Sequence, residues 1–314
     1  MDLKEFECEK IKILDTSEID IIKWDKCVSN TGGWSLYSKS WYLNAVTHNS
    51  WKALVLGDYE GVMPFVTAKK VFFNFCLPPL LTKQNDFLFR NHLFLEELDV
   101  YLHLTKHFSR IELLTRRQIE NSGFTSSKKI NHVIPLESKT IQNIRSNYNR
   151  NTKRNINKAI FEEIHISEIF NIKEISKFII SCDNTKYFLK YPHILPSLLP
   201  EILEKGRGKV YGAFKNKDLT AIGIFVVEDD RVYFLICCSN QVGKETKSMF
   251  LLIDEAISFY CNLGMSIFDF TGSSIQSIAR RNLGFGSIEE VYYHTVYNHS
   301  ILNFIGPLIK KSKQ

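Results

Sequence analysis

The sequence lacks the features that mark a membrane-spanning or secreted protein. No apolar stretch approaches the roughly 18 residues that a membrane-spanning helix needs. The longest apolar passages, Val71–Leu81 and Ile301–Ile309, are broken by Asn and Pro or by Asn and Gly. The N-terminal segment MDLKEFECEK is acidic and has no apolar core, so we expect no signal peptide. These absences favour a cytoplasmic protein without stable membrane insertion.

Paired cysteines and clustered histidines are also missing. The chain has seven cysteines, an odd number, and no CxxC motif. Cys237 and Cys238 are adjacent in a segment with the pattern of a strand, so their side chains should point to opposite faces. This usage is typical of reduced cysteine in a reducing compartment. The histidines are scattered and form no HExxH motif, so we expect no metal site.

What is present is enough apolar sequence for two folded domains. At roughly 100–200 residues per domain, 314 residues suggest two. Hydrophobic residues make up 44% of the chain and charged residues 24%, a composition typical of globular proteins. We therefore expect each half of the chain to bury a core of its own.

The net charge of +6 is concentrated in one segment. Between Lys139 and Lys158 the chain has six basic residues and no acidic residue, and the rest of the chain is neutral overall. Such a block of one sign suits the phosphates of RNA or of a nucleotide-linked substrate. The alternative is the solvated face of a helix. The proposed binding residues are Arg145, Arg150, Lys153, Arg154 and Lys158.

The hydrophobic pattern of the second half predicts a β-β-β-α-β-α-β order. Three strands, at 209–216, 219–227 and 231–239, are separated by the turn signals Asn-Lys-Asp and Glu-Asp-Asp. Apolar residues at helical spacing follow, from Thr246 to Leu263. A short strand, a helix that ends near Gly284 and a last strand at 290–297 complete the pattern.

The first half shows the same order with no obvious identity between the copies. Strands are expected at 51–56, 59–68, 71–76, 111–115 and 130–136, with helices at 93–108 and 117–122. Additional helices are expected at 19–30 and 40–48, and, before the second meander, at 140–160 and 172–203. The sequence thus predicts an α/β chain of two similar domains with mixed, mostly antiparallel sheets.

One candidate binding loop lies at Asn240–Ser248, between a strand and the start of a helix. Free N–H groups at a helix start attract phosphate. Gly243, Lys244, Thr246 and Lys247 are the candidate cofactor-binding residues. The loop has a single glycine, so neither a P-loop nor GxGxxG is present. An ordinary capped turn with solvated lysines is the alternative.

A second candidate site is centred on Asp269, in the short strand that precedes Gly272-Ser273-Ser274. Arg280 and Arg281 follow on the next helix, where a guanidinium can hold an anion. We take Asp269 and Arg280 as the candidate catalytic residues. The alternative is that Asp269 pairs with one of these arginines and only closes the loop.

Several segments resemble the FemAB-type branch of the GNAT acyltransferase superfamily. They sample nearly the whole chain, and the last two are the more specific. These segments are Trp41-Tyr42-Leu43 with Trp51–Phe65, then Pro78–Gln84, Lys153–Ala159 (KRNINKA), and FDFTGS with IARRNLGFGS within Phe268–Ser287.

The resemblance implies two tandem GNAT-like domains, at 1–138 and 139–300, with a cleft between them. It implies a tail at 301–314 that packs back on the first domain. It also implies transfer of an acyl or aminoacyl group to an amine acceptor, with acyl-CoA or aminoacyl-tRNA as co-substrate and no tightly bound cofactor.

The chain departs from the family where relatives have an aromatic pair and a lysine before a Phe-Gly. Here these places hold Arg281, Asn282 and Leu283. The usual GNAT tyrosine acid and the glycine-rich CoA loop are also missing. Two hypotheses follow: an N-acyl or aminoacyl transferase, or a non-catalytic module that binds RNA or a nucleotide-linked ligand on the same scaffold.

Overall fold

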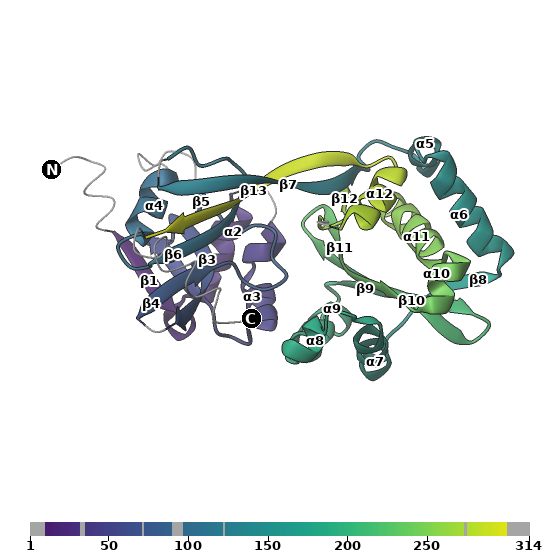
Figure 1. The fold of residues 1–314 in the computed structure, drawn as a ribbon, viewed down its shortest axis with the longest axis horizontal. Coiled ribbons are helices and arrows are strands. Elements are labelled where there is room, and N and C mark those ends of the chain that lie inside the picture. Colours follow the sequence, from purple (N-terminus) through teal and green to yellow (C-terminus); the bar gives the residue numbers. More distant parts are fainter. Residues whose placement is uncertain are drawn as a thin grey trace, which may run out of the picture. The chain divides into compact units, whose positions relative to one another are not determined.

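Contacts divide the chain into two compact units. Of the residues described in this computed structural model, unit 1 holds those up to Lys129 and from Val291 on, and unit 2 holds Ile130–Glu290. The chain passes between the units within two long strands, β7 (Phe124–Pro135) and β13 (Ile288–Asn298) (Figure 1). The described residues are 10–31, 35–70, 72–89, 97–121, 123–272 and 275–299.

Unit 1 is built on a mixed sheet with the strand order β1-β2-β3-β4-β6-β13. Neighbours pair antiparallel except β4 and β6, which run parallel, and the short strand β5 pairs with β3. The strands before β13 are β1 (Ile11–Asp15), β2 (Lys52–Leu56), β3 (Gly61–Lys70), β4 (Phe73–Leu77), β5 (Leu88–Phe89) and β6 (Arg110–Thr115). The helices are α2 (Ile21–Ser29), α3 (Ser40–Thr47) and α4 (Glu97–Leu104), with 3-10 turns at Thr16–Glu18 and Ser35–Ser38.

Alternation along β2 builds a core on each face of this sheet. Leu54 and Leu56 point to one face, where they join a cluster that includes Tyr101 of α4. Ala53 and Val55 point to the other face and join the side chains of α2 and α3. Trp24 and Trp51 meet there edge to face, with ring centroids 4.8 Å apart.

The strands of unit 2 continue the same 13-stranded order as β7-β12-β11-β10-β9-β8. Strands β8 to β11 pair antiparallel, β11 and β12 run parallel, and β12 pairs antiparallel with the end of β7. The strands after β7 are β8 (Ile164–Glu168), β9 (Gly208–Lys215), β10 (Asp218–Glu228), β11 (Arg231–Ser239) and β12 (Ile267–Asp269).

Helices cover both faces of the unit 2 sheet. Helices α7, α8 and α9 lie on one side of β9 and β10, and α6 and α11 lie on the other (Figure 1). No helix in the described part of the chain is long and apolar enough to cross a membrane. The helices are α5 (Ile141–Ser146), α6 (Arg150–Phe161), α7 (Ile172–Cys182), α8 (Tyr187–Lys190), α9 (Ile194–Leu203), α10 (Gln241–Thr246), α11 (Ser248–Asn262) and α12 (Gln276–Gly284).

The predicted meander of the second half is confirmed as β9, β10 and β11. The predicted helix after it is α11, which ends before Gly264; this glycine adopts a left-handed φ of 81°. The helix expected at 117–122 is wrong for its described residues, which form no helix. There the hydroxyl of Ser126 both accepts from the N–H of Ile119 and donates to its carbonyl.

The single helix expected at 140–160 is two helices, because Asn149 begins a second one. Its side chain accepts a hydrogen bond from the N–H of Thr152 at 2.8 Å, and its own N–H donates to the carbonyl of Gly284. The segment expected as helix at 172–203 is likewise three helices. The boundary at 138/139 stays a prediction, and the tail at 301–314 lies outside the described residues.

Candidate functional site

Helix α6 presents the concentrated positive charge of the sequence on one face. Its buried side is formed by Thr152, Asn155, Ile156 and Ala159, which follow helical spacing. The opposite side is exposed and basic. Along it lie Arg150, Lys153, Arg154, Asn157, Lys158 and Phe161.

Ion pairs are scarce among these cations. Among the described residues, Arg150, Lys153 and Arg154 form no ion pair: Lys153 donates to the carbonyl of Ser146, and Arg154 to the side chain of Asn151. Lys158 acts only as a nearby charge on Glu162. By contrast, Lys205, Arg207, Lys209 and Lys215 of the same unit each pair with a glutamate. The charge of α6 is therefore available to an outside partner.

The end of this basic face carries an aromatic ring in the solvent. Phe161 is 86% exposed, although it is the last residue of a helix with a well-formed buried side. Exposed aromatic rings beside cations are the usual platform for unpaired nucleic-acid bases. We name the face formed by Arg150, Lys153, Arg154, Lys158 and Phe161 the α6 face.

Arg145, which the sequence grouped with these cations, has a different role. Its Nε and Nη2 donate to the two oxygens of Asp254 at 3.0 and 2.8 Å. This bidentate pair joins α5 to α11. Beside it lies a pocket of about 400 Å³, whose lining includes Arg145, Tyr148, Lys153, Leu251 and Asp254.

The loop at 240–248 uses much of its polar chemistry internally. Asn240 accepts from the N–H of Gly243 at 2.9 Å. A Cβ on Gly243 would lie 2.2 Å from the carbonyl oxygen of Thr220, so this glycine lets α10 approach β10. Thr246 is buried and shares a hydroxyl contact of 2.7 Å with Ser248. The close approach of α10 to β10, rather than a phosphate-binding loop, explains the glycine at position 243.

The side chains of two lysines in this loop reach the solvent. Lys244 is exposed, and Lys247 is half-buried in a left-handed conformation, with φ of 63°, at the start of α11. They are the loop side chains that an anionic donor can reach. The hydroxyl of Thr246 does not cap α11 and instead donates to the carbonyl of Val242.

Asp269 lies at the centre of a buried polar network. It is fully buried at the end of β12, and its Oδ2 lies 2.6 Å from Nη2 of Arg231. Its Oδ1 accepts from Asn131 at 2.9 Å and from the N–H of Thr271 at 2.6 Å. Arg231 also reaches Glu290 at 2.5 Å. Burial raises the pKa of Asp269, and Arg231 opposes the rise.

The expected arginine partners of Asp269 are elsewhere. Arg280 is exposed on α12. Arg281 is directed to the side chain of Asn282 and to the sulfur of Cys237, and its guanidinium lies over the ring of Phe234. The alternative offered from the sequence, a pair between Asp269 and Arg280 or Arg281, is therefore wrong, because the arginine that pairs with Asp269 is Arg231.

The two more specific segments of the family resemblance meet in space. The start of α6 contacts the end of α12, where a Cβ on Gly284 would lie 2.4 Å from Oγ1 of Thr152. Phe285 packs between Tyr148 and Phe250, with centroid distances of 5.1 and 5.9 Å. Leu283, at the place of the family lysine, is 44% exposed.

Unit 1 contains a titratable group that the sequence analysis missed. Glu97 lines a pocket of about 250 Å³ with Arg116 and Arg117. Burial and the nearby carboxylate of Asp86 raise the pKa of Glu97 to about 7, against the opposing effect of both arginines. Asp86 is itself buried and pairs with Arg116 at 3.1 Å. Nothing in the sequence near Glu97 signals this environment, because it depends on burial and on Asp86.

No protein-family model matches this sequence, and no curated protein matches it. Solved structures of similar fold include FemX, with a TM-score of 0.66 at 10% identity over 94% of this chain and 99% of that one. Another is the C-terminal domain of a protein assigned as a lysylphosphatidylglycerol synthetase, from Agrobacterium fabrum, with a TM-score of 0.59 at 8% identity over 90% and 93%. A tandem GNAT protein from the clavulanic acid biosynthesis pathway has a TM-score of 0.53 at 7% identity over 91% and 97%.

These matches extend over nearly the full length of each partner, so the likeness includes both units. The chain has the FemAB-like tandem GNAT fold, with mixed, mostly antiparallel sheets, as the sequence predicted. At identities of about 10%, the likeness establishes the fold alone. The reaction has to be inferred from the residues of this chain.

Proposed function

We propose that this protein is an N-acyl or aminoacyl transferase that takes its acyl group from a phosphate-bearing donor. The fold supports this class of reaction, because it is shared with FemX, with a domain assigned to lysylphosphatidylglycerol synthesis and with a tandem GNAT protein. Those names indicate aminoacyl or acyl chemistry but do not identify the substrate of this chain.

The observation that carries the proposal is the α6 face. Three cations without acidic partners among the described residues, with an exposed Phe161 at the end of their helix, match the backbone phosphates and unpaired bases of RNA. Aminoacyl-tRNA is therefore our preferred donor over acyl-CoA. Lys244 and Lys247 of the 240–248 loop are proposed as further donor contacts, with Gly243 and Thr246 positioning them.

The reaction balances without a metal or a redox cofactor as reactant. The nitrogen of a neutral amine attacks the acyl carbonyl, a C–N bond forms, and the C–O bond of the tRNA ester, or the C–S bond of acyl-CoA, breaks. A base takes the proton from the amine, and the leaving oxygen or sulfur takes a proton.

Asp269 and Arg280 keep narrower proposed roles. Asp269 is held by Arg231, Asn131 and the Thr271 amide, so we propose that it positions the end of β12 rather than accepting a proton. Arg280 is exposed and is proposed as a contact to an anionic substrate group. Arg145 is proposed to support α5 through Asp254 rather than to contact the substrate directly.

A transfer assay tests this function. Labelled aminoacyl-tRNA and labelled acyl-CoA are each incubated with the protein and a panel of primary amines, including lysine side chains in peptides and aminolipids, and labelled amides are identified by mass spectrometry. We expect labelled amide from aminoacyl-tRNA, formed at least about tenfold more slowly when Arg150, Lys153 and Arg154 are all replaced by Ala. No amide from either donor would contradict the proposal.

The second candidate is a module that binds RNA without transferring a group. It is favoured by the exposed Leu283 at the place of the family lysine. One comparison distinguishes the two candidates. A binding module binds tRNA but forms no amide, and its Leu283→Lys variant forms no amide either. A transferase forms amide with the natural residue in place.

A further inference from the structure

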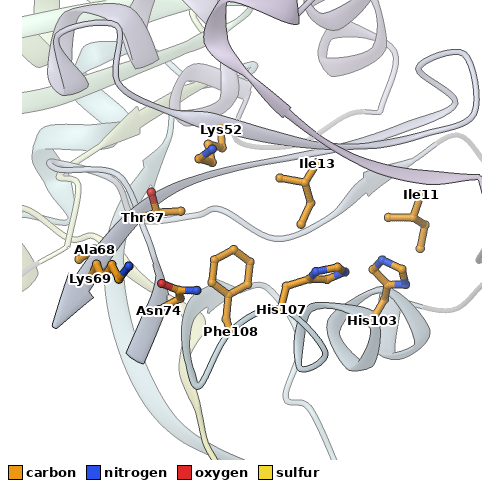
Figure 2. A pocket seen from close by; sticks show the side chains of 10 residues that line it. All are labelled: Ile11, Ile13, Lys52, Thr67, Ala68, Lys69, Asn74, His103, His107 and Phe108. Carbon is orange, nitrogen blue, oxygen red and sulfur yellow. The ribbon is translucent and has the colours of Figure 1, made fainter. Parts of the chain in front are cut away.

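Unit 1 contains a second, larger cavity of about 780 Å³, at the C-terminal end of α4 (Figure 2). Its volume lies within the range of about 300–1,000 Å³ that is usual for small-molecule sites. The lining side chains come from β1, β2, β3, β4, the end of α4 and the turn that follows it. None of the acyl-transfer residues proposed above lines it.

Two opposed walls give this cavity an apolar, slot-like part. Ile11 and Ile13 project from β1 on one side (Figure 2). Phe108, His107 and His103 form a row of rings on the other side, and the two imidazole centroids are 5.2 Å apart. A flat ring fits between aliphatic side chains and ring faces with little loss of packing.

The other end of the cavity is polar and positively charged. Lys69, Asn74 and Thr67 gather there, and Lys52 lies near them (Figure 2). Lys52 is already paired with Asp15, whereas Lys69 forms no ion pair among the described residues. Among the residues that the structure describes, no carboxylate lines the cavity. Its charge therefore favours an anionic group at this end.

The two imidazoles of this wall differ in exposure: His103 is half-buried and His107 is exposed. Sequence reasoning missed this pair, although His103 and His107 are four residues apart, the spacing of neighbours on a helix.

We propose that this cavity binds an aromatic carboxylate, with its ring between the isoleucines and the ring wall and its carboxylate on Lys69 and Asn74. The assignment joins two separate features of the site: the slot and the positive charge at one end. It does not depend on the transferase reaction.

Binding of three matched probes tests the proposal. Isothermal titration calorimetry with the full chain compares 2-naphthoate, the cation 2-naphthylmethylamine and the neutral 2-naphthalenemethanol. We expect 2-naphthoate to bind about tenfold or more tightly than either other probe, with no change after EDTA. Equal affinity for the cation, or binding that EDTA abolishes, would overturn the proposal.

Two variants on one strand place the binding at this cavity. Lys69→Glu should weaken 2-naphthoate binding about tenfold. Lys70→Glu makes the same charge change at the next residue, which does not line the cavity, and should leave binding within about twofold.

Ala68→Trp adds bulk at an exposed lining position and should block binding without unfolding the chain. Circular dichroism of each variant checks that the fold is kept. Binding that is unaffected by both Lys69→Glu and Ala68→Trp would place the ligand elsewhere and refute the assignment.

Discussion

Arg231 and Asp269 form a buried ion pair, with Nη2 and Oδ2 2.6 Å apart, between β11 and β12 of unit 2. Both side chains are almost fully buried. Burial lowers the pKa of Arg231, but the charges of Asp269 and Glu290 more than offset this, so its pKa ends above the usual value. Arg231 thus keeps its charge, which both carboxylates stabilise.

Replacement of Asp269 by Asn should destabilise the protein, because it removes a carboxylate that pairs with the buried guanidinium of Arg231. We expect a loss of about 3 kcal/mol in the free energy of unfolding, measured by urea titration. Asp218→Asn, an exposed change of the same chemistry, should cost no more than about 0.5 kcal/mol. Equal losses of unfolding free energy in the two variants would show that the buried network adds no more stability than an exposed aspartate does.

The pair between Glu112 and His294 should make unit 1 sensitive to acid. The hydrogen bond from His294, with help from Arg110, lowers the pKa of Glu112 to about 2, against the effect of burial. A lowered folded pKa gives stability that is present above the unfolded value and lost as the pH falls toward 2. Glu112→Gln should remove about 1 kcal/mol of this dependence, allowing for screening at a partly exposed pair.

Urea unfolding at pH 5 and at pH 2.5 measures the effect. Glu120→Gln, an exposed substitution in the same unit, serves as the control. An acid slope in Glu112→Gln as steep as that of the parent chain would contradict the assignment.

Glu97 should give the opposite pH dependence, a contribution to stability that falls as the pH rises. Its pKa is raised to about 7, chiefly by burial, so the folded state favours the protonated carboxyl. The stability from this preference is complete below the unfolded value and is lost as the pH rises through 7. Glu97→Gln should therefore be the more stable chain at pH 8, by on the order of 1 kcal/mol, and show no gain at pH 4. A gain at both values would mean that packing, rather than ionisation, is responsible.

Gly243 gives a test in which packing and helix propensity predict opposite signs. Alanine is favoured over glycine by about 1 kcal/mol inside a helix. At this place, however, its Cβ would lie 2.2 Å from a backbone oxygen of β10. We expect Gly243→Ala to lose about 1–3 kcal/mol in urea unfolding, as overpacked sites do. Lys244→Ala is the neighbouring exposed control, and a more stable Gly243→Ala would refute the contact.

Sequence patterns predicted the elements whose signals are local. The meander β9 to β11 follows from alternation and turn residues, and the end of α11 from Gly264. The same reasoning merged α5 with α6, because the capping role of Asn149 depends on a contact with Gly284 far along the chain. It also missed the strands β1 and β8, which are short and lie at the edges of their sheets.

The candidate site was predicted in part. The concentrated charge of α6 is visible in the sequence, and the structure places it on one exposed face. The partner of Asp269 was not visible, because Arg231 lies 38 residues away and on another strand. The raised pKa of Glu97 depends on burial and on Asp86, and neither is encoded by nearby residues.

The measurement that tests the central claim most directly is the salt dependence of tRNA binding to the α6 face. Fluorescence anisotropy with labelled tRNA compares the parent chain with Arg150→Ala, Lys153→Ala and Arg154→Ala combined. The control combines Lys173→Ala, Lys177→Ala and Lys217→Ala, three exposed lysines elsewhere in unit 2. We predict that the slope of log K against log salt becomes shallower by about 2 in the α6 variant and stays unchanged in the control. Equal slopes in all three proteins would contradict the account.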